Sequence, residues 1–327
     1  MNPVKGKVSI VTVAYNHEKF IKDSVTSALA QTYANSEIIV GDDGSSDGTK
    51  DVIADLALKN STKIIPLFSS KNEGFAKNIN RCFDRCSGEY IATLGGDDFM
   101  LPDKIAKQVE FLSKNEEYGL CTHDMEVFES KTGKVLYNTG ERYLSPDGGI
   151  EEAFRTNWFF GPEPKTIPSS ILARSAVFLT HRYRPDLQFW GDWLHMIDSL
   201  VTSSKKWGHL SEILGRYRVH DKQMHTSDEA AAVSFEQMLT VLAISSSRYP
   251  ELTKLIKNKR DFILFQHLVF DWHPEEKREA FEKQFRIEAG LLKWMYMKLC
   301  RSYLHHRRLF EMTRPLRHFA KRVLADH

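Results

Sequence analysis

The sequence predicts an α/β fold, with a mostly parallel sheet covered by helices on both faces, followed by an α-helical C-terminal region. Three features of the chain point to this fold. Apolar, β-branched segments alternate with segments of helical periodicity through the first third of the chain. Two of these apolar segments end in paired acids, and beyond residue 227 only helical periodicity remains. We therefore expect two domains, residues 1–227 and residues 228–327.

Strands and helices alternate regularly in the first half of the chain. The segment 7–14 is apolar and β-branched, which is typical of a buried strand. Apolar residues at helical spacing predict a helix over residues 18–30. The pattern continues with strands at 37–40, 63–68 and 90–94, and with helices at 49–59, 76–86 and 104–112. Such alternation brings the carboxyl ends of parallel strands to one edge of the sheet.

The pattern changes after Tyr118. A strand is expected at 120–129, followed by a hairpin near residues 131–134. Three further elements precede the boundary near residue 227: a strand or short helix at 171–178, a helix from 190 to 200, and a strand at 207–217. Beyond the boundary, helices are expected at 229–247, 252–270, 275–286 and 287–308.

Composition is that of an ordinary globular protein. The chain has 327 residues, of which 42% are hydrophobic and 27% charged, and its net charge of +2 gives no general case for nucleic-acid binding. Four cysteines do not form a disulfide framework at this length. The N-terminus leads into a strand without a signal peptide, and no run of eighteen apolar residues is present. We therefore expect a cytoplasmic protein.

Paired acids follow two of the predicted strands. Asp42 and Asp43 follow the second strand after Gly41, and Asp97 and Asp98 follow the fourth strand after Gly95-Gly96. Carboxylates at a shared strand edge could hold a nucleotide, a divalent cation, or both. The structural alternatives are an Asp/Gly-rich turn with a helix cap for the first pair and solvent-exposed loop acids for the second.

Three other segments are candidates for the same site. Val13, Tyr15 and Asn16 lie at the end of the first strand, where a base or pyrophosphate could bind, although a plain turn also explains them. Asp192 lies among aromatic residues, which suits a general base with a raised pKa or, equally, a helix N-cap. His220 follows the last strand and is either a metal ligand or a structural histidine.

Taken in order, these motifs resemble the family-2 glycosyltransferases, inverting enzymes with an A-type glycosyltransferase fold. The resemblance runs from Val8 to about residue 225. It is carried by the Val-Ser-Ile-Val…Tyr-Asn opening, the Asp-Asp-Gly-Ser-Ser-Asp-Gly-Thr loop, the Asn72…Gly74…Asn78 segment and the Gly-Glu-Tyr-Ile…Asp-Asp strand. It implies a nucleotide-sugar donor. The donor-binding residues that it implies are Val13, Tyr15, Asn16, Asp42, Asp43, Asn72, Lys77, Gly96, Asp97 and Asp98.

The resemblance also implies the catalytic residues. The family's metal motif is usually Asp-X-Asp, and here its first acid falls on Gly95, so this chain lacks that ligand. Asp97 would hold Mg²⁺ or Mn²⁺ with Asp98 as support, and His220 is a further candidate metal or phosphate contact. Asp192 matches the family's catalytic base, preceded here by Gly191 in place of the usual Glu. The Gln-X-X-Arg-Trp motif of processive members is missing, which favours transfer of one sugar per event.

The C-terminal region is basic and amphipathic. Its basic residues are Lys293, Lys298, Arg301, Arg307, Arg308, Arg314, Arg317, Lys321 and Arg322, with Glu311 as the only acid between them. Large apolar and aromatic side chains are interleaved with them, which suits an anionic membrane surface or a packed helical cap, including a homo-oligomer interface. Membrane contact would fit a saccharide or lipid-linked saccharide acceptor in cell-surface polysaccharide biosynthesis.

Two other classes of function are alternatives to a glycosyltransferase. A catalytically degenerate module that still binds sugar nucleotides would explain Gly95, but Asp97 and Asp192 argue for an active enzyme. A nucleotidyltransferase would need a glycine-rich, basic phosphate loop after the first strand, and the sequence there offers none. Aromatic residues between 143 and 187, among them Trp158, Phe159, Phe160 and His181, are candidates to stack on acceptor sugars or to form core.

Overall fold

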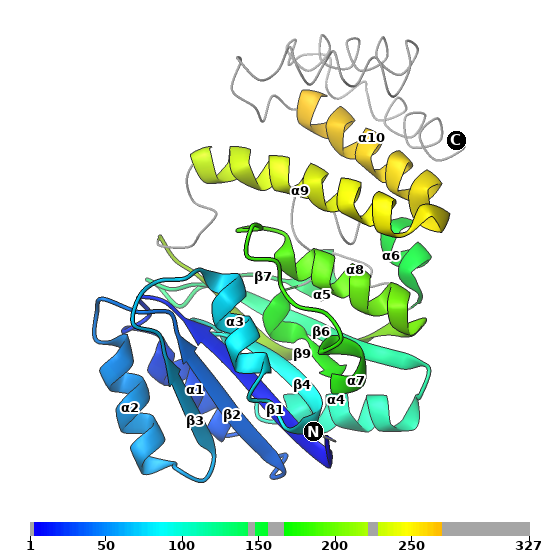
Figure 1. Cartoon of the computed structure of the whole chain (residues 1–327). Helices are drawn as coiled ribbons and strands as arrows, with labels where there is room; N and C mark the ends of the chain where they lie inside the picture. The colour runs from blue at the N-terminus through cyan, green and yellow to red at the C-terminus, as the bar shows by residue number, and fades with distance from the viewer. Residues whose placement is uncertain (1–2, 143–147, 156–166, 222–227, 270–327) are drawn as a thin grey trace. The chain divides into compact units, whose positions relative to one another are not determined.

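The computed structural model describes residues 3–142, 148–155, 167–221 and 228–269 (Figure 1). The chain divides into two compact units, Met1–Val241 and Leu242–His327. The division falls inside helix α9 (Asp228–Arg248). A separate functional role for residues 228–327 stays a prediction. The helices expected at 275–286 and 287–308 and the basic residues of segment 293–322 lie outside the described residues.

One mixed sheet forms the centre of the first unit. Its strands are β1 (Val4–Ala14), β2 (Ser36–Asp42), β3 (Ile64–Phe68), β4 (Gly88–Gly95), β5 (Phe99–Met100), β6 (Tyr118–Glu129), β7 (Val135–Asn138), β8 (Leu172–Arg174) and β9 (Lys206–Val219). Their order is β3-β2-β1-β4-β8-β6-β9-β5, with β7 paired to β6. The first four are parallel, as the alternation predicts, and β8 runs antiparallel to both of its neighbours.

Helices flank both faces of the parallel part of the sheet. The helices of the first unit are α1 (Ile21–Leu29), α2 (Thr49–Lys59), α3 (Phe75–Phe83), α4 (Lys104–Lys114), α5 (Thr139–Arg142), α6 (Ile150–Arg155), α7 (Ser175–Phe178) and α8 (Gly191–Ser203), with a 3₁₀ turn at Pro168–Ser170 and α9 crossing into the second unit. The second unit contains a 3₁₀ turn at Pro250–Leu252 and α10 (Thr253–Val269). The segment 171–178, predicted as a strand or a short helix, contains both, because β8 leads directly into α7.

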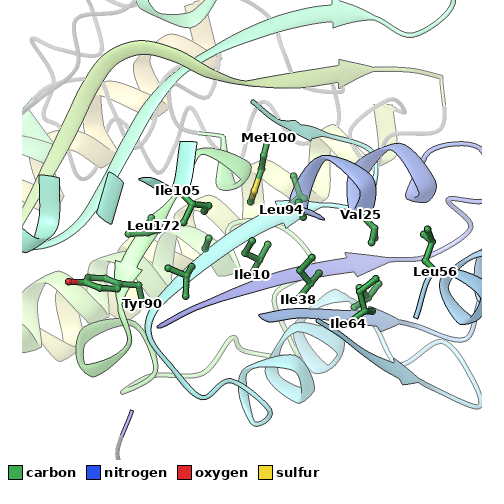
Figure 2. Packing of buried hydrophobic residues seen from close by; sticks show 14 of the residues in the cluster. Ile10, Val25, Ile38, Leu56, Ile64, Tyr90, Leu94, Met100, Ile105 and Leu172 are labelled. Atoms are coloured by element: carbon green, nitrogen blue, oxygen red, sulfur yellow. The ribbon is translucent and has the colours of Figure 1, made fainter. Parts of the chain in front are cut away.

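Buried side chains of β1 and β2 pack on both faces of the sheet. Ile10 of β1 and Ile38 of β2 lie in one cluster with apolar residues of α1, α2 and α4 (Figure 2). Val11 and Ile39, one position further along, are equally buried, and α3 contacts β1 and β2. Successive strand side chains point to opposite faces, so strands buried on both faces need continuous apolar runs. This explains why the central parts of β1 and β2 consist mostly of apolar residues.

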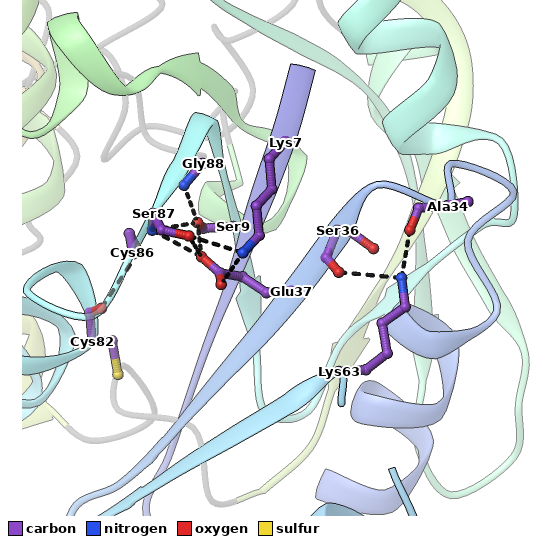
Figure 3. A network of polar contacts seen from close by, with 10 residues as sticks. All are labelled: Lys7, Ser9, Ala34, Ser36, Glu37, Lys63, Cys82, Cys86, Ser87 and Gly88. Carbon is purple, nitrogen blue, oxygen red and sulfur yellow. Dashed lines mark hydrogen bonds and ion pairs between the residues drawn. The ribbon is translucent and has the colours of Figure 1, made fainter. Parts of the chain in front are cut away.

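A buried carboxylate ties β1, β2 and the start of β4 together. Glu37 of β2 accepts hydrogen bonds from the Lys7 ammonium at 2.6 Å, the Ser9 hydroxyl at 2.6 Å and the Ser87 amide at 2.8 Å (Figure 3). Ser9 in turn accepts from the Gly88 amide at 2.9 Å. Because both oxygens of the carboxylate accept hydrogen bonds, its burial between the strands is compensated.

Within the described part of the chain, no helix has the length and hydropathy needed to cross a bilayer.

Candidate functional site

Strands β1, β2 and β4 end at the same edge of the sheet, and the first acid pair lies there. Asp42 is fully buried, and its carboxylate accepts from the Ser45 hydroxyl and from the Gly44 and Ser45 amides. Asp43 accepts from the Glu73 amide at 3.0 Å and the Gly74 amide at 2.8 Å. The two acids therefore shape the loops that would surround a donor. Direct donor contact by either acid stays a prediction.

Asn16 joins the end of β1 to the acidic loop. Its amide donates to the Ser45 hydroxyl, and its side-chain oxygen accepts from the Ser46 amide, both at 2.9 Å. Its φ of 55° is left-handed, a conformation that Asn tolerates better than most residues. The neighbouring Tyr15 is 43% exposed, and the Val13 carbonyl accepts from the Gly96 amide at 3.1 Å.

Two further predicted donor contacts, Asn72 and Lys77, lie in the loop before α3 and in its first turns. Asn72 accepts from the Gly74 amide at 3.0 Å through its side-chain oxygen. Lys77 is 54% exposed and lies 3.9 Å from Glu73. Asp43 accepts hydrogen bonds from the Glu73 and Gly74 amides of this loop, so the loop lies at the same edge of the sheet as the first acid pair.

In the second acid pair, Asp97 is hydrogen-bonded to a histidine that lies far away in the sequence. Asp97 Oδ2 lies 3.0 Å from His220 Nε2, and both side chains are largely buried. Burial acts to raise the pKa of Asp97, but the His220 hydrogen bond and the charges of His17 and His220 outweigh it, so the pKa lies below its usual value. Asp97 is thus held as a carboxylate.

Asp98 faces the protein interior. Its oxygens accept from the Ser169 hydroxyl and from the Arg218 amide at 3.0 Å, and burial beside Asp97 raises its pKa well above the usual value. The Arg218 guanidinium donates to the Asp97 carbonyl at 2.8 Å and lies over the ring of Phe20 at 4.8 Å. Asp98 and Arg218 therefore fix the backbone that carries Asp97, in keeping with a supporting role for Asp98.

His17 is a member of this cluster that sequence reasoning missed. Its ring lies edge-on to the His220 ring, with centroids 6.4 Å apart, and its buried Nδ1 has no hydrogen-bond partner. Burial lowers the pKa of His17, although the Asp97 carboxylate opposes that shift. The signal was available: His17 directly follows Asn16 at the strand end.

The two glycines before Asp97 lie in tight surroundings. A Cβ on Gly95 would lie 2.8 Å from Asp97 Oδ1 and 3.0 Å from Asp98 Oδ2. A Cβ on Gly96 would lie 2.7 Å from His17 Nδ1. A larger side chain at position 95 would therefore require the Asp97 and Asp98 carboxylates to shift.

Asp192 lies in the first turn of α8. Its Oδ1 accepts from the Trp193 amide at 2.9 Å. Burial raises the pKa of Asp192 to about 6, and the hydrogen bond from Trp193 opposes this only in part. The carboxylate therefore both satisfies one of the free amides of the helix start and has the proton affinity of a general base near neutral pH.

Tyr183 connects the Asp192 region to the donor loops. The backbone amide and carbonyl of Tyr183 bond both ends of the Asn80 side-chain amide, at 2.9 and 2.8 Å. Its ring stacks on His195 of α8 and meets Phe75 of α3 edge-on, with centroids 4.6 and 5.6 Å apart. Burial and the charge of Asp192 raise the pKa of Tyr183 well above its usual value. Helices α3 and α8 are thus joined through one aromatic residue.

Among the candidate acceptor residues, His181 bonds the Thr202 hydroxyl at 3.0 Å on the surface of the protein. Trp158, Phe159 and Phe160 lie outside the described residues.

Comparison with known proteins gives one consistent family. The model of glycosyl transferase family 2 matches residues 9–167. An uncharacterized glycosyltransferase of Rickettsia typhi is 30% identical over 225 residues, 68% of this chain and 67% of the relative. Two Bacillus subtilis proteins are each 37% identical over shorter stretches. The putative glycosyltransferase EpsE matches over 38% of this chain, and the putative teichuronic acid biosynthesis glycosyltransferase TuaG over 33%. The chain covers only 44% and 42% of their respective lengths.

Solved structures share the fold. Staphylococcus aureus TarS 1–349 in complex with UDP-GlcNAc superposes with a TM-score of 0.63 at 14% identity, covering 90% of this chain and 88% of TarS 1–349. The Pyrobaculum calidifontis mannosyltransferase PcManGT, in complex with GDP-Man and Mn²⁺, gives 0.58 at 14% identity, covering 100% and 86%. The fold is the A-type glycosyltransferase fold, as predicted. The chain belongs to the family-2 glycosyltransferases.

Proposed function

We propose that this glycosyltransferase moves one sugar from a nucleotide-sugar donor to an acceptor hydroxyl with inversion at the anomeric carbon. The observation that carries the proposal is a pair of carboxyl groups in opposite electrostatic settings. Asp97 has a lowered pKa beside His220, whereas burial raises the pKa of Asp192 to about 6. Groups whose environments separate their pKa values in this way are typical of divided roles in one reaction.

The donor would bind along the carboxyl edge of β1, β2 and β4. Tyr15 is exposed there and can contact a base, and the loops held by Asp42 and Asp43 surround the same edge. The donors named with the solved relatives, UDP-GlcNAc for TarS and GDP-Man for PcManGT, are the first two to test on this chain.

Asp97 would hold a Mn²⁺ or Mg²⁺ ion, and His220, whose Nε2 lies 3.0 Å from Asp97, would be a further metal or phosphate contact. Among the described residues, no set of three or more His, Cys, Asp or Glu side chains is arranged to hold a metal alone. An ion with one or two protein ligands completes its shell with phosphate oxygens and water, and the imidazole favours Mn²⁺ over Mg²⁺. When bound, such an ion neutralises charge that develops on the leaving diphosphate.

In the proposed reaction, the Asp192 carboxylate removes the proton of the acceptor hydroxyl. The acceptor oxygen forms a bond to the anomeric carbon on the face opposite the nucleotide. The bond from that carbon to the diphosphate oxygen breaks, and its electron pair leaves with the nucleoside diphosphate. Asp97 and Arg218 hold the loop at the end of β4 in place.

We further propose that the acceptor is a glycan or lipid-linked saccharide of a cell-surface polysaccharide. The name of TuaG, a teichuronic acid biosynthesis glycosyltransferase, supports this. A cytoplasmic location is part of the proposal, with the basic segment of residues 293–322 on an anionic inner membrane face or in a homo-oligomer. Binding of the full chain to anionic, but not to neutral, liposomes would distinguish the membrane from the oligomer.

The test of the donor site is a thermal-shift screen of nucleotide sugars, with and without Mn²⁺. One donor should raise the melting temperature of the wild type. Product analysis with that donor then establishes the anomeric configuration. A donor that binds but is never transferred would instead indicate a sugar-nucleotide-binding module, which the missing acid at Gly95 makes the second candidate.

A further inference from the structure

Helix α8 begins with a strained residue. Trp190 precedes the helix with φ 62° and ψ 6°, the left-handed region, where residues with bulky side chains are rare. A residue at this position normally has extended backbone angles. Such a conformation persists only where surrounding contacts impose it, and it occurs most often at functional sites.

Contacts from α9 hold Trp190 and its neighbour Phe189. The Trp190 indole Nε1 donates to the Ser234 hydroxyl at 2.8 Å. One residue earlier, the Phe189 amide donates to the Gln237 side-chain oxygen at 2.7 Å. Ser234 and Gln237 are three positions apart, so they lie on the same face of their helix. Two neighbouring residues of the α8 start are therefore held by one face of α9.

The same start sets the direction of Asp192. The Trp190 carbonyl accepts the first helical hydrogen bond, from the Leu194 amide at 3.1 Å. Asp192 lies inside this turn, and its carboxylate is oriented by the Trp193 amide. If the contacts of Phe189 and Trp190 are lost, the start of α8 is no longer held in this arrangement, and the Asp192 side chain in its first turn is free to reorient.

We propose that Ser234 and Gln237 are positioning residues that hold the proposed base Asp192 in place through the strained Trp190. This inference rests on the proposed function. The proposal makes α9 a part of the active-site scaffold. One face of α9 contacts residues 189–190, and these residues lead into α8, the helix that carries the proposed base.

A first test needs no substrate. Urea unfolding gives the free energy of unfolding of the wild type and of Asp192→Asn from pH 4 to 8. The same comparison of Asp with Asn at position 192 is then made in proteins that also carry Ser234→Ala or Thr240→Ala. Thr240 lies on α9, is exposed and bonds only within its own helix, so it is the matched control. We expect the pH-dependent stability gap between Asp and Asn to shrink in the Ser234→Ala background, because a released Asp192 is less desolvated. It should be unchanged in the Thr240→Ala background.

A second test uses turnover. The probe is release of nucleoside diphosphate from the donor selected by the thermal-shift screen, with water as acceptor. Ser234→Ala and Gln237→Ala should each lower kcat about three- to tenfold, the usual worth of one hydrogen bond, with donor KM unchanged. The acidic limb of kcat should move to lower pH, and Ser234→Thr, which keeps the hydroxyl, should restore both values.

A third measurement isolates the Trp190–Ser234 bond. Trp190→Phe removes the indole donor and keeps an aromatic ring. The double variant with Ser234→Ala should lose no more kcat than the worse single variant, because both changes remove the same bond.

Equal stability gaps in the Ser234→Ala and Thr240→Ala backgrounds would overturn the positioning role, whatever the fate of the proposed function. Full turnover by Asp192→Asn would instead overturn the base assignment itself. The two failures are thus distinguishable.

Discussion

Asp97 Oδ2 and His220 Nε2 lie 3.0 Å apart, although the two residues are 123 positions apart in the chain. The pair joins the loop after β4 to the end of β9. An ionised carboxylate only accepts hydrogen bonds, so His220 carries its proton on Nε2. The His220 ring packs on Phe20 with centroids 4.6 Å apart, which limits its rotation. The central acid of the site therefore has a fixed orientation and a fixed charge.

Removal of the Asp97 charge should abolish metal-dependent donor binding. In Asp97→Asn the side chain keeps its size but loses the charge that would attract a divalent cation. We expect the donor that stabilises the wild type in Mn²⁺ to give no thermal shift with this variant. Asp55→Asn, an exposed change on α2, is the control and should behave as the wild type. An undiminished shift in Asp97→Asn would show that Asp97 does not hold the ion.

Removal of the proposed base should abolish turnover and spare donor binding. A positioned carboxylate base contributes about 10²- to 10⁴-fold to the rate. Asp192→Asn should therefore lower kcat on that scale, while the donor-dependent thermal shift stays at the wild-type value. The measurement is sugar transfer to acceptor together with the shift assay. Turnover within threefold of the wild type would disprove the assignment.

The raised pKa of Asp192 also predicts how stability depends on pH. Because burial raises this pKa from 3.8 to about 6, the folded protein binds more protons than the unfolded chain between these values. The contribution of Asp192 to stability is therefore full below pH 3.8 and is lost as the pH rises through about 6. Asp192→Asn should be more stable than the wild type at pH 8 and equal to it near pH 4, as urea unfolding can measure.

The sequence predicted those parts of the fold and site that depend on local pattern. The helix expected at 49–59 has those bounds as α2, because helical periodicity and its flanking Gly and Asn are local signals. The acids at the ends of β2 and β4 were recognised for the same reason. Asp192 was placed at a helix start, and the structure confirms that position.

What the sequence did not reveal depends on partners that are distant along the chain. Asp42 and Asp43 were expected to contact a donor or to form a turn, and the sequence did not reveal that their oxygens accept hydrogen bonds from the backbone amides of two loops. Ser169 gave no signal, because its role is visible only once it meets Asp98. The left-handed Trp190 was equally hidden, since its conformation is imposed by contacts from α9.

Gly95 predicts a steric limit on the site. Alanine there would place its Cβ 2.8 Å from Asp97 Oδ1 and 3.0 Å from Asp98 Oδ2, so the carboxylates must move. We expect Gly95→Ala to lose the donor-dependent thermal shift and to lower the free energy of unfolding by about 1–3 kcal/mol, as overpacking usually does. Gly149→Ala, where nothing lies within 4 Å of the new Cβ, is the control. Retention of both properties in Gly95→Ala would show that the carboxylates have room to move.

Glu37 predicts a contribution to stability that is separate from the active site. Burial acts to raise its pKa, but hydrogen bonds from Lys7, Ser9 and Ser87 outweigh it, so the pKa lies below its usual value of 4.5. Its contribution to stability is therefore present above pH 4.5 and is lost as the pH falls through the lower, folded value. Glu37→Gln should cost about 1–3 kcal/mol of unfolding free energy at pH 7, the cost of weakening a buried charged network.

The matched control for Glu37 is Glu110→Gln. Glu110 pairs with Lys114 on the exposed face of α4, with 62% of its side chain accessible. An exposed helix pair of this kind adds little to stability, because water and salt screen it. Urea unfolding at pH 7 and pH 4 should therefore show a large cost for Glu37→Gln that shrinks at the lower pH, and a small cost for Glu110→Gln. Equal costs at pH 7 would mean that the Glu37 network adds no more to stability than a surface pair does.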